Sequence, residues 1–267
     1  MEVSEVVRRA PAIALRDHVL PYWGWEERTE GPVRRRECPS GHVHVILQFG
    51  TTIDTLEPVR RTHGSFVAGL HESPAYTEHD GDSHGIEINL TPPAANRLLG
   101  LPMDTVTGEI PAAEDLLGPG ASRFVDRLWN EESWERRFEL LDVALSERLA
   151  DGPQPSPGLE WAWRRLVATQ GRVPVAALAA ELGWSRRRLV MRFREHVGLP
   201  PKRYARILRF QHALELLIRN GSRLADVALE CGYYDQAHMN RDFRLFAGVT
   251  PTEWLAARSG DGFGVAA

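Results

Sequence analysis

The amino-acid sequence predicts an α+β fold, in which a mixed, mainly β domain at the N-terminus is followed by an all-α domain with two helix-turn-helix units in tandem. Three observations predict it. Apolar residues alternate with period two in the first half of the chain, the second half has a helical pattern that repeats once, and a segment rich in proline and glycine lies between the halves. A chain of 267 residues is long enough for two domains that each bury a core.

The first half contains several predicted strands. In residues 42–49, Val43, Val45, Leu47 and Phe49 fall on one side and His42, His44, Ile46 and Gln48 on the other. Further strand candidates are residues 65–70, 75–78 and 85–90, with a turn signal at 80–83. Strands of this kind are compatible with a small barrel of the cupin type. Helical patterns follow over residues 92–99, 122–129 and 133–150.

Residues 151–158 mark the boundary between the two domains. The segment holds three prolines and two glycines, which neither a helix nor a paired strand sustains, so a short and stiff linker is expected. It separates an N-terminal domain of residues 1–150 from a C-terminal domain of residues 159–257. Residues 258–267 are expected to form a frayed tail.

Charge is distributed unequally between the halves. The formal net charge of −4 does not by itself indicate a nucleic-acid binder. Residues 158–267, however, hold 17 basic and 10 acidic side chains, a net charge of +7, whereas residues 1–157 hold 15 and 26, a net charge of −11. Such asymmetry indicates a basic module joined to an acidic one.

Other features bear on the compartment and on catalysis. Two distant cysteines, Cys38 and Cys231, exclude a disulfide framework and fit a reducing compartment, and the acidic N-terminus does not resemble a secretory signal, so a cytoplasmic location is expected. No apolar run approaches the length of a membrane span. We find no Ser-His-Asp spacing, glycine-rich phosphate loop or HExxH motif. We therefore expect neither an enzyme nor a bound cofactor.

The second half repeats itself with an offset of about 50 residues. Residues 176–183 parallel residues 225–232, and the second copy carries one extra turn residue near Tyr234. After this extra residue the offset is 50, and the matched residues are, in order, Phe193, Arg194, Gly198, Pro201 and Tyr204 in the first copy and Phe243, Arg244, Gly248, Pro251 and Trp254 in the second. Glycine, proline and aromatic residues at matched spacing indicate two copies of one structural unit.

Each copy has the pattern of a helix-turn-helix unit, over about residues 173–198 and 222–248. Gly183 and Gly232 end the first helices, and Ser185 and Asp235 are suited to cap the second ones. The apolar residues expected to face inward are Val175, Leu178, Ala179, Leu182, Leu189, Phe193 and Val197 in the first copy and Leu224, Val227, Ala228, Cys231, Met239, Phe243 and Phe246 in the second. One long helix, residues 201–219, is expected to fix the spacing of the two units.

These motifs carry a resemblance to a known family. Residues 232–244 (GYYDQAHMNRDFR) with Gly248-Val-Thr-Pro251, and residues 183–193 (GWSRRRLVMRF), resemble the two helix-turn-helix signatures of the AraC/XylS family of bacterial transcription regulators. The resemblance implies a sequence-specific, double-stranded DNA-binding regulator, an activator or a repressor, with RNA polymerase as a partner. The first copy departs from the family at Met191, where a basic or polar residue is usual.

The second helix of each unit is expected to enter the major groove. The candidate DNA-binding residues are Arg186, Arg187, Arg188, Val190, Met191, Arg192, Arg194, Gln236, Ala237, Asn240 and Arg241. Among them, Arg187 best suits guanine, and Gln236 or Asn240 adenine. For each arginine, the alternative is a solvated surface charge without a DNA contact. For residues 235–242, the family resemblance implies another alternative, in which they orient the helix and do not read bases.

Residues 1–150 are similar to a poorly characterised N-terminal domain of some of these regulators, which implies a domain that senses a small effector or forms a homodimer. The candidate effector-binding residues are Tyr22, Trp23, Trp25, His42 and His44. An alternative is that His42 and His44, with Glu87, serve a metal-dependent β-barrel enzyme that carries a helical appendage, although no metal site is assigned. Cys38, which follows three arginines and Glu37, is either a thiol of lowered pKa or a surface thiol without a role.

Overall fold

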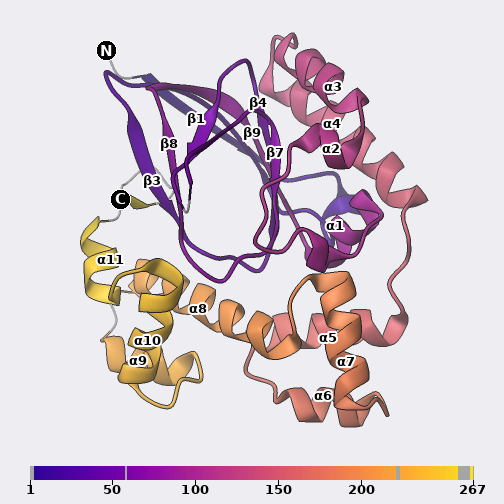
Figure 1. The fold of residues 1–267 in the computed structure, drawn as a ribbon, viewed down its shortest axis with the longest axis vertical. Coiled ribbons are helices and arrows are strands. Elements are labelled where there is room, and N and C mark those ends of the chain that lie inside the picture. Colours follow the sequence, from indigo (N-terminus) through magenta and orange to yellow (C-terminus); the bar gives the residue numbers. More distant parts are fainter. Residues whose placement is uncertain (1–2, 58, 221–222, 258–264, 267) are drawn as a thin grey trace.

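The computed structural model describes residues 3–57, 59–220, 223–257 and 265–266 and has the predicted α+β architecture. Two antiparallel sheets lie at the top of Figure 1, with helices α1–α4 beside them and the helical second half beneath. The strands are β1 (Val3–Arg9), β2 (Tyr22–Arg28), β3 (Val33–Glu37), β4 (Val43–Gln48), β5 (Ile53–Thr55), β6 (Arg61–His63), β7 (Phe66–Ala68), β8 (Ala75–His79), β9 (Asp82–Leu90) and β10 (Val265–Ala266).

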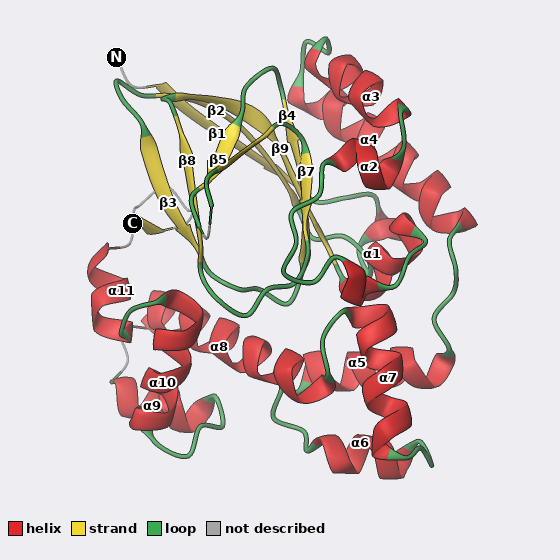
Figure 2. Cartoon of the chain, in the orientation of Figure 1, coloured by secondary structure: helices red, strands yellow, loops and turns green. Residues whose placement is uncertain are grey.

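The strands form two five-stranded sheets. The first has the order β1-β2-β9-β4-β7 and the second β10-β3-β8-β5-β6, and every pairing between described strands is antiparallel (Figure 2). Within the part of the chain that the structure describes, the two sheets do not close into a single barrel, so the sequence pointed to the correct class but not to a closed cupin-type barrel.

The two faces of the first sheet have different environments. Val43, Val45 and Leu47 of β4 and Ile86 and Ile88 of β9 are buried on one face. This apolar face packs against the helices of the first half, which are η1 (Ile13–Leu15, 3₁₀), α1 (Pro92–Leu99), η2 (Met103–Thr105, 3₁₀), α2 (Ala113–Leu117), α3 (Gly120–Trp129) and α4 (Trp134–Asp151). The opposite face looks toward the second sheet, and alternation along each strand therefore separates a helix-covered core from an inter-sheet space.

The second half confirms both predicted helix-turn-helix units. Its helices are α5 (Pro157–Ala168), α6 (Val175–Glu181), α7 (Arg186–Val197), α8 (Pro201–Asn220), α9 (Leu224–Glu230), α10 (Gln236–Ala247) and α11 (Pro251–Ala257). Gly183 and Gly232 have φ of +62° and +76°, the left-handed conformation that glycine adopts cheaply. The turn of the second unit is one residue longer, as the sequence offset predicted.

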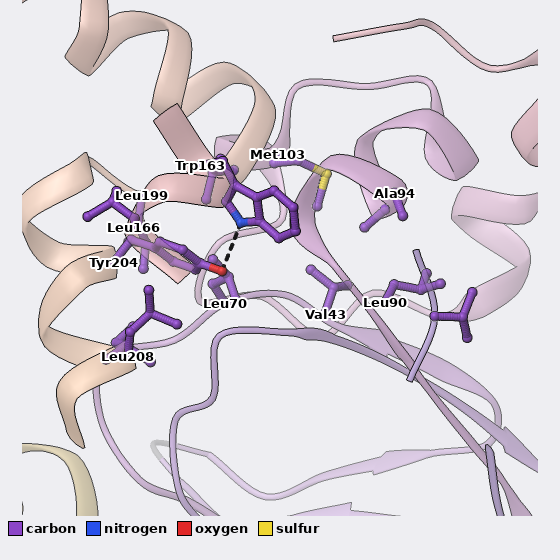
Figure 3. Close-up of a cluster of buried hydrophobic side chains, with 14 of the residues drawn as sticks. Val43, Leu70, Leu90, Ala94, Met103, Trp163, Leu166, Leu199, Tyr204 and Leu208 are labelled. Atoms are coloured by element: carbon purple, nitrogen blue, oxygen red, sulfur yellow. Dashed lines mark hydrogen bonds between the residues drawn. The ribbon is translucent and has the colours of Figure 1, made fainter. Parts of the chain in front are cut away.

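The two halves share a continuous apolar core. Trp163 of α5 and Tyr204 of α8 lie in one buried cluster with Val43 of β4, Leu70 and Met103 (Figure 3). A core that crosses the boundary resists independent movement of the halves, because separating them exposes apolar surface to water.

The boundary segment is shorter than predicted. Asp151 still belongs to α4, and Pro157 and Gly158 open α5, which leaves residues 152–156 outside helices. Pro157 is compatible with the helix because the first turn needs no backbone donor from it.

The predicted frayed tail lies mostly outside the described residues. Within it, Val265 and Ala266 pair with Arg36 and Arg35 of β3 as the short strand β10. Among the described helices, none is both long and apolar enough to cross a membrane.

Candidate functional site

Helix α7 is held by its inner face and by its first residue. Leu189, Phe193 and Val197 are fully buried at helical spacing, as predicted. The Ser185 side chain accepts a hydrogen bond from the backbone N–H of Arg188 at 3.2 Å, which caps the helix. The helix is thereby fixed with its outer face and N-terminal end toward solvent.

The outer face of α7 carries most of the predicted DNA-binding residues. Arg186, Arg187, Arg188, Met191 and Arg194 are exposed, and Val190 and Arg192 are half-buried. Two of the seven have partners within the protein. The Arg188 guanidinium stacks on the Trp184 ring at 4.5 Å, and Arg192 pairs with Glu195 at 2.6 Å. No ion pair to Arg186, Arg187 or Arg194 occurs among the described residues.

Helix α10 occupies the same place in the second unit. Asp235 caps it by accepting the backbone N–H of His238 at 2.7 Å. Asp242, which is 1% exposed, accepts a hydrogen bond from the half-buried Arg206 of α8 at 2.6 Å, and this ion pair fixes the rotation of α10 about its axis. Both acidic residues thus make contacts within the protein that orient α10, which is the alternative to base reading considered for residues 235–242.

The predicted DNA-binding residues of α10 are less basic than those of α7. Ala237 and Arg241 are exposed, and Gln236 and Asn240 are half-buried. The first unit therefore presents a concentrated positive charge, whereas the second presents amide groups and one arginine. This difference suggests unequal contributions from the two units to phosphate contact.

A cavity of about 490 Å³ lies between the two sheets. It is lined mostly by alternate residues of the facing strands, which are Trp23, Trp25, Glu27, Arg35, Glu37, His44, Ile46, Ile53, Thr55, Phe66, Ala68, Ala75, Thr77, His79, Ser83 and Glu87. The loop residues that complete the wall are Cys38, Glu57, Gly69, His71, Glu72, Ser73, Pro74, Gly108, Glu109 and Ile110. The volume is in the range of small-molecule sites.

A glycine opposite Trp25 makes room for the aromatic wall of the cavity. Gly85 pairs with Trp25, and a Cβ there would lie 2.7 Å from Trp25 Cζ2 and 2.5 Å from the Leu47 carbonyl oxygen. The indole Nε1 donates to Ser83 Oγ at 2.9 Å. Its neighbour Trp23 receives the Arg8 guanidinium over its ring at 4.8 Å. Both tryptophans therefore have fixed positions.

The structure separates the five candidate effector-binding residues. Trp23, Trp25 and His44 line the cavity, but Tyr22 and His42 do not. Tyr22 points to the other face of its strand, where its hydroxyl donates to Asp142 Oδ1 at 2.8 Å and its ring stacks on Phe138. Period-two alternation explains the position of Tyr22, which directly precedes the cavity-lining Trp23 and therefore points into the helix-covered core.

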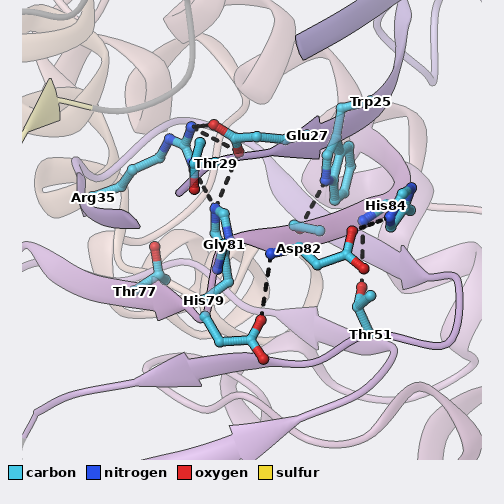
Figure 4. Close-up of polar contacts among 12 residues, drawn as sticks. Trp25, Glu27, Thr29, Arg35, Thr51, Thr77, His79, Gly81, Asp82 and His84 are labelled. Atoms are coloured by element: carbon cyan, nitrogen blue, oxygen red, sulfur yellow. Dashed lines mark hydrogen bonds and ion pairs between the residues drawn. The ribbon is translucent and has the colours of Figure 1, made fainter. Parts of the chain in front are cut away.

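A buried polar cluster occupies one end of the cavity (Figure 4). Arg35 donates two hydrogen bonds from Nη2 to Glu27, at 2.7 and 3.0 Å, and His79 lies 3.0 Å from the same carboxylate. Burial opposes ionisation of Glu27, but the bonds from His79 and Arg35 outweigh it and lower its pKa to about 2. The sequence does not single out these residues, because β3 pairs with β8 in one sheet while β2 belongs to the other, and only the packing of the two sheets brings the three side chains together.

A second polar cluster contains His44. Its Nδ1 lies 2.7 Å from Glu87 Oε1, and its Nε2 lies 2.7 Å from Ser40 Oγ. Despite burial, the bond to Glu87 raises the pKa of His44, and His44 lowers the pKa of Glu87. Both ring nitrogens are engaged, and no group of three metal-ligating side chains occurs among the described residues. The geometry thus gives no support to the metal-dependent alternative.

The reactive-thiol interpretation of Cys38 is wrong. Burial, together with the adjacent Glu37 carboxylate, raises the pKa of the Cys38 thiol to about 12. The nearby Arg36 guanidinium opposes this rise in pKa, but burial outweighs it.

Two contacts join the region around the cavity to helix α8. Gly41, three residues before His44, donates its N–H to Gln211 Oε1 at 3.1 Å and accepts from the Tyr204 hydroxyl at 3.0 Å. A second connection is the ion pair of Glu72, a lining residue, with Arg203 at 2.8 Å. The helix that spaces the two helix-turn-helix units therefore contacts the cavity wall directly.

Two family models match the chain. Residues 178–257 match the helix-turn-helix domain, and residues 7–111 match a domain of unknown function (DUF6597). The transcriptional activator RhaR of Klebsiella pneumoniae is 32% identical over 93 residues, which are 30% of this chain and 33% of that protein. RhaR of Escherichia coli K12 is 32% identical over 74 residues, 28% and 26% of the two chains. The alignment thus spans about a third or less of the length of these relatives.

Solved structures extend the comparison. ToxT from Vibrio cholerae aligns over 96% of this chain and 98% of its own, with a TM-score of 0.50 and 10% identity, which shows similarity of fold. A transcriptional regulator with an AraC-type DNA-binding domain, from Chromobacterium violaceum, is 28% identical over 40% of this chain and 96% of its own, with a TM-score of 0.36.

Proposed function

Because its C-terminal region belongs to the AraC-type helix-turn-helix family, we propose that the whole chain is a sequence-specific DNA-binding transcription regulator. In this proposal α7 and α10 enter successive major grooves, about 34 Å apart, on one face of the double helix. The observation that carries it is the pair of capped helices with buried inner faces and solvent-facing outer residues, joined by the rigid helix α8.

The candidate contacts divide into two classes. Arg187, exposed on the first turn of α7, suits a bidentate contact to guanine O6 and N7, and Val190 and Met191 suit thymine methyl groups. Arg188 and Arg194 suit phosphates. Stacking on Trp184 would fix the Arg188 guanidinium for such a contact.

The N-terminal domain, residues 1–150, is proposed to sense a small effector in the inter-sheet cavity. The cavity has the size of a small-molecule site, its lining residue Glu72 pairs with Arg203 of α8, and Gly41, just before strand β4, is hydrogen-bonded to the same helix. A ligand that favours one position of this wall would shift the orientation of the two units on DNA, provided that its affinity differs between the two positions.

Further parts of the proposal concern location and partners. We propose a cytoplasmic protein in which residues 152–156 link the N-terminal domain to a DNA-binding domain that ends at residue 257, with RNA polymerase as a partner and homodimerisation through the N-terminal domain. Two free cysteines, one half-buried and one buried, are compatible with the reducing compartment.

Selection of bound sequences from random duplexes tests the proposal. The expected result is a motif with two blocks of preferred bases, about 10 base pairs from centre to centre, and affinity that falls steeply with salt. Recovery of no enriched motif at low salt, with the folded full-length chain, would refute sequence-specific binding.

A further inference from the structure

The charge of the inter-sheet cavity is strongly unbalanced. Its lining contains six glutamates, which are Glu27, Glu37, Glu57, Glu72, Glu87 and Glu109. Arg35 is the one arginine or lysine among the described lining residues, and three histidines, His44, His71 and His79, complete the titratable set. An anionic ligand would meet repulsion from this surface, whereas a cation would be attracted.

The basic groups near the cavity are already paired. Arg35 and His79 contact Glu27, His44 contacts Glu87, and Arg203 reaches in from α8 to Glu72. One further cation, the Arg8 guanidinium, reaches the cavity wall, where it lies over the Trp23 ring at 4.8 Å. No arginine in the wall is thus left to neutralise an incoming carboxylate or phosphate.

Glu37 is the exception among the deep carboxylates. Its contact is a hydrogen bond from the Thr77 hydroxyl to Oε1 at 3.3 Å, and no ion pair to Glu37 occurs among the described residues. Burial, and then the nearby Glu87 carboxylate, raise the pKa of Glu37. A positive charge placed beside Glu37 would therefore relieve an unfavourable buried charge.

Aromatic rings line the same space. Trp23 and Trp25 come from β2 and Phe66 from β7, and Ile46 and Ile53 add apolar surface. The Arg8 guanidinium over Trp23 shows that this ring accepts a cation on its face. A ligand that suits both surfaces has a flat or apolar body and a positively charged group.

We propose that the effector is an organic cation, of the arylalkylamine class, whose ammonium lies beside Glu37 and whose apolar body packs against Trp23 and Trp25. This inference rests on the proposed effector-sensing function. It names the chemistry that the cavity recognises.

Isothermal titration calorimetry with three matched compounds tests the charge preference. Tryptamine, tryptophol and indole-3-acetate share an indole and differ in carrying an ammonium, a hydroxyl or a carboxylate group. Tryptamine is expected to bind at least about tenfold more tightly than tryptophol, since a close buried charge pair contributes more than 1 kcal/mol, and indole-3-acetate most weakly. Mg²⁺ and Zn²⁺ alone are not expected to bind in place of the amine.

The variant Glu37→Gln identifies the charge that is used. It keeps the shape of the side chain and an acceptor for Thr77, so the protein should fold, while tryptamine affinity should fall by about tenfold. The matched control is Glu147→Gln, on the exposed surface of α4, which should bind tryptamine like the unmodified chain. Tryptamine affinity should also weaken as the pH falls, because the raised pKa of Glu37 lets its carboxylate take up a proton earlier than an ordinary glutamate does, and the raised pKa of His44 adds positive charge to the cavity.

Three results would overturn the proposal. They are tighter or equal binding of tryptophol or indole-3-acetate, no detectable tryptamine binding at about 10 mM, and equal tryptamine affinity of Glu37→Gln and the unmodified chain. None of these results affects the duplex selection, which is performed without amine. Failure of the cation proposal is therefore distinguishable from failure of the DNA-binding proposal.

Discussion

At the scale of single residues, Arg187 has the clearest expected effect on DNA recognition. It is exposed on the first turn of a capped helix, with no ion pair to it among the described residues. Arg187→Ala is expected to cost about 1–3 kcal/mol of binding free energy and to relax specificity at one base position. Competition binding against single-base variants of the selected duplex measures both quantities. Arg123→Ala, exposed on α3, is the control.

An equal loss of affinity on every duplex would place Arg187 on phosphate instead. The distinction matters because base contacts specify sequence, while phosphate contacts position the protein.

The buried side chain of His42 is expected to make the stability of the protein depend on pH. Burial, then His44, lowers the pKa of His42 from its ordinary 6.5 to about 4. Below pH 6.5 the unfolded chain takes up a proton that the folded chain refuses, so the free energy of unfolding falls as pH drops toward 4, by at most about 1.4 kcal/mol per pH unit from this group. Denaturant unfolding at pH 7 and pH 5 should show a smaller decline for His42→Gln than for the unmodified chain. Identical declines would contradict the assignment.

Residue types in the sequence predict only part of the lining of the inter-sheet cavity. Trp23, Trp25 and His44 were selected from the sequence and line the cavity. Glu27, Arg35 and Glu37 were not selected, because charged residues at alternate positions look like solvent-exposed strand edges until a second sheet covers them. Alternation across β3, together with the histidine at the end of β8, is the signal that could have revealed them.

At the scale of elements, the caps of the recognition helices make a separable contribution to stability. Ser185 supplies the capping oxygen for α7. Ser185→Ala should cost about 0.5–2 kcal/mol of unfolding free energy and lower Tm by about 1–8 °C. Differential scanning calorimetry checks the value, with Ser146→Ala on the exposed face of α4 as a control that should change Tm little. An unchanged Tm for Ser185→Ala would mean that water replaces the cap.

Helices and strands with one buried apolar face could be predicted from the sequence, whereas strands without such a face could not. Strand β4 and helices α7 and α10 were predicted because one face of each is apolar and buried. Strands β1 and β3 were missed: their sequences, VSEVVRR and VRRRE, carry charges on the face toward solvent or the polar cavity. A strand that borders polar space has no reason to show a continuous apolar face.

At the scale of the whole molecule, the contact between the two halves of the chain could not be predicted from the sequence. The pattern of one strand or one helix does not reveal that Gly41, just before strand β4, is hydrogen-bonded to α8, or that Trp163 and Tyr204 belong to a shared core. Such contacts depend on long-range packing of elements that are each stable in several arrangements. They nevertheless decide whether a ligand in one half is felt in the other.

A substitution of Gln211 tests whether a ligand in the cavity is coupled to DNA binding through α8. Its side chain accepts the N–H of Gly41 from a half-buried position on α8, away from both recognition helices and from the cavity lining. Gln211→Ala should leave DNA affinity without ligand within about twofold, because no DNA contact is removed, while reducing the change in affinity that a bound effector causes. A coupling free energy is typically about 1–3 kcal/mol, and one of two hydrogen bonds to Gly41 is expected to carry part of it.

The measurement is DNA affinity with and without saturating tryptamine, for the unmodified chain and for Gln211→Ala. By reciprocity, the variant should also show a smaller effect of the duplex on tryptamine affinity, which gives a second estimate of the same coupling. Equal coupling in the two proteins would show that Gly41 does not transmit the effect and would direct attention to the Glu72–Arg203 ion pair, the other described contact between the cavity wall and α8.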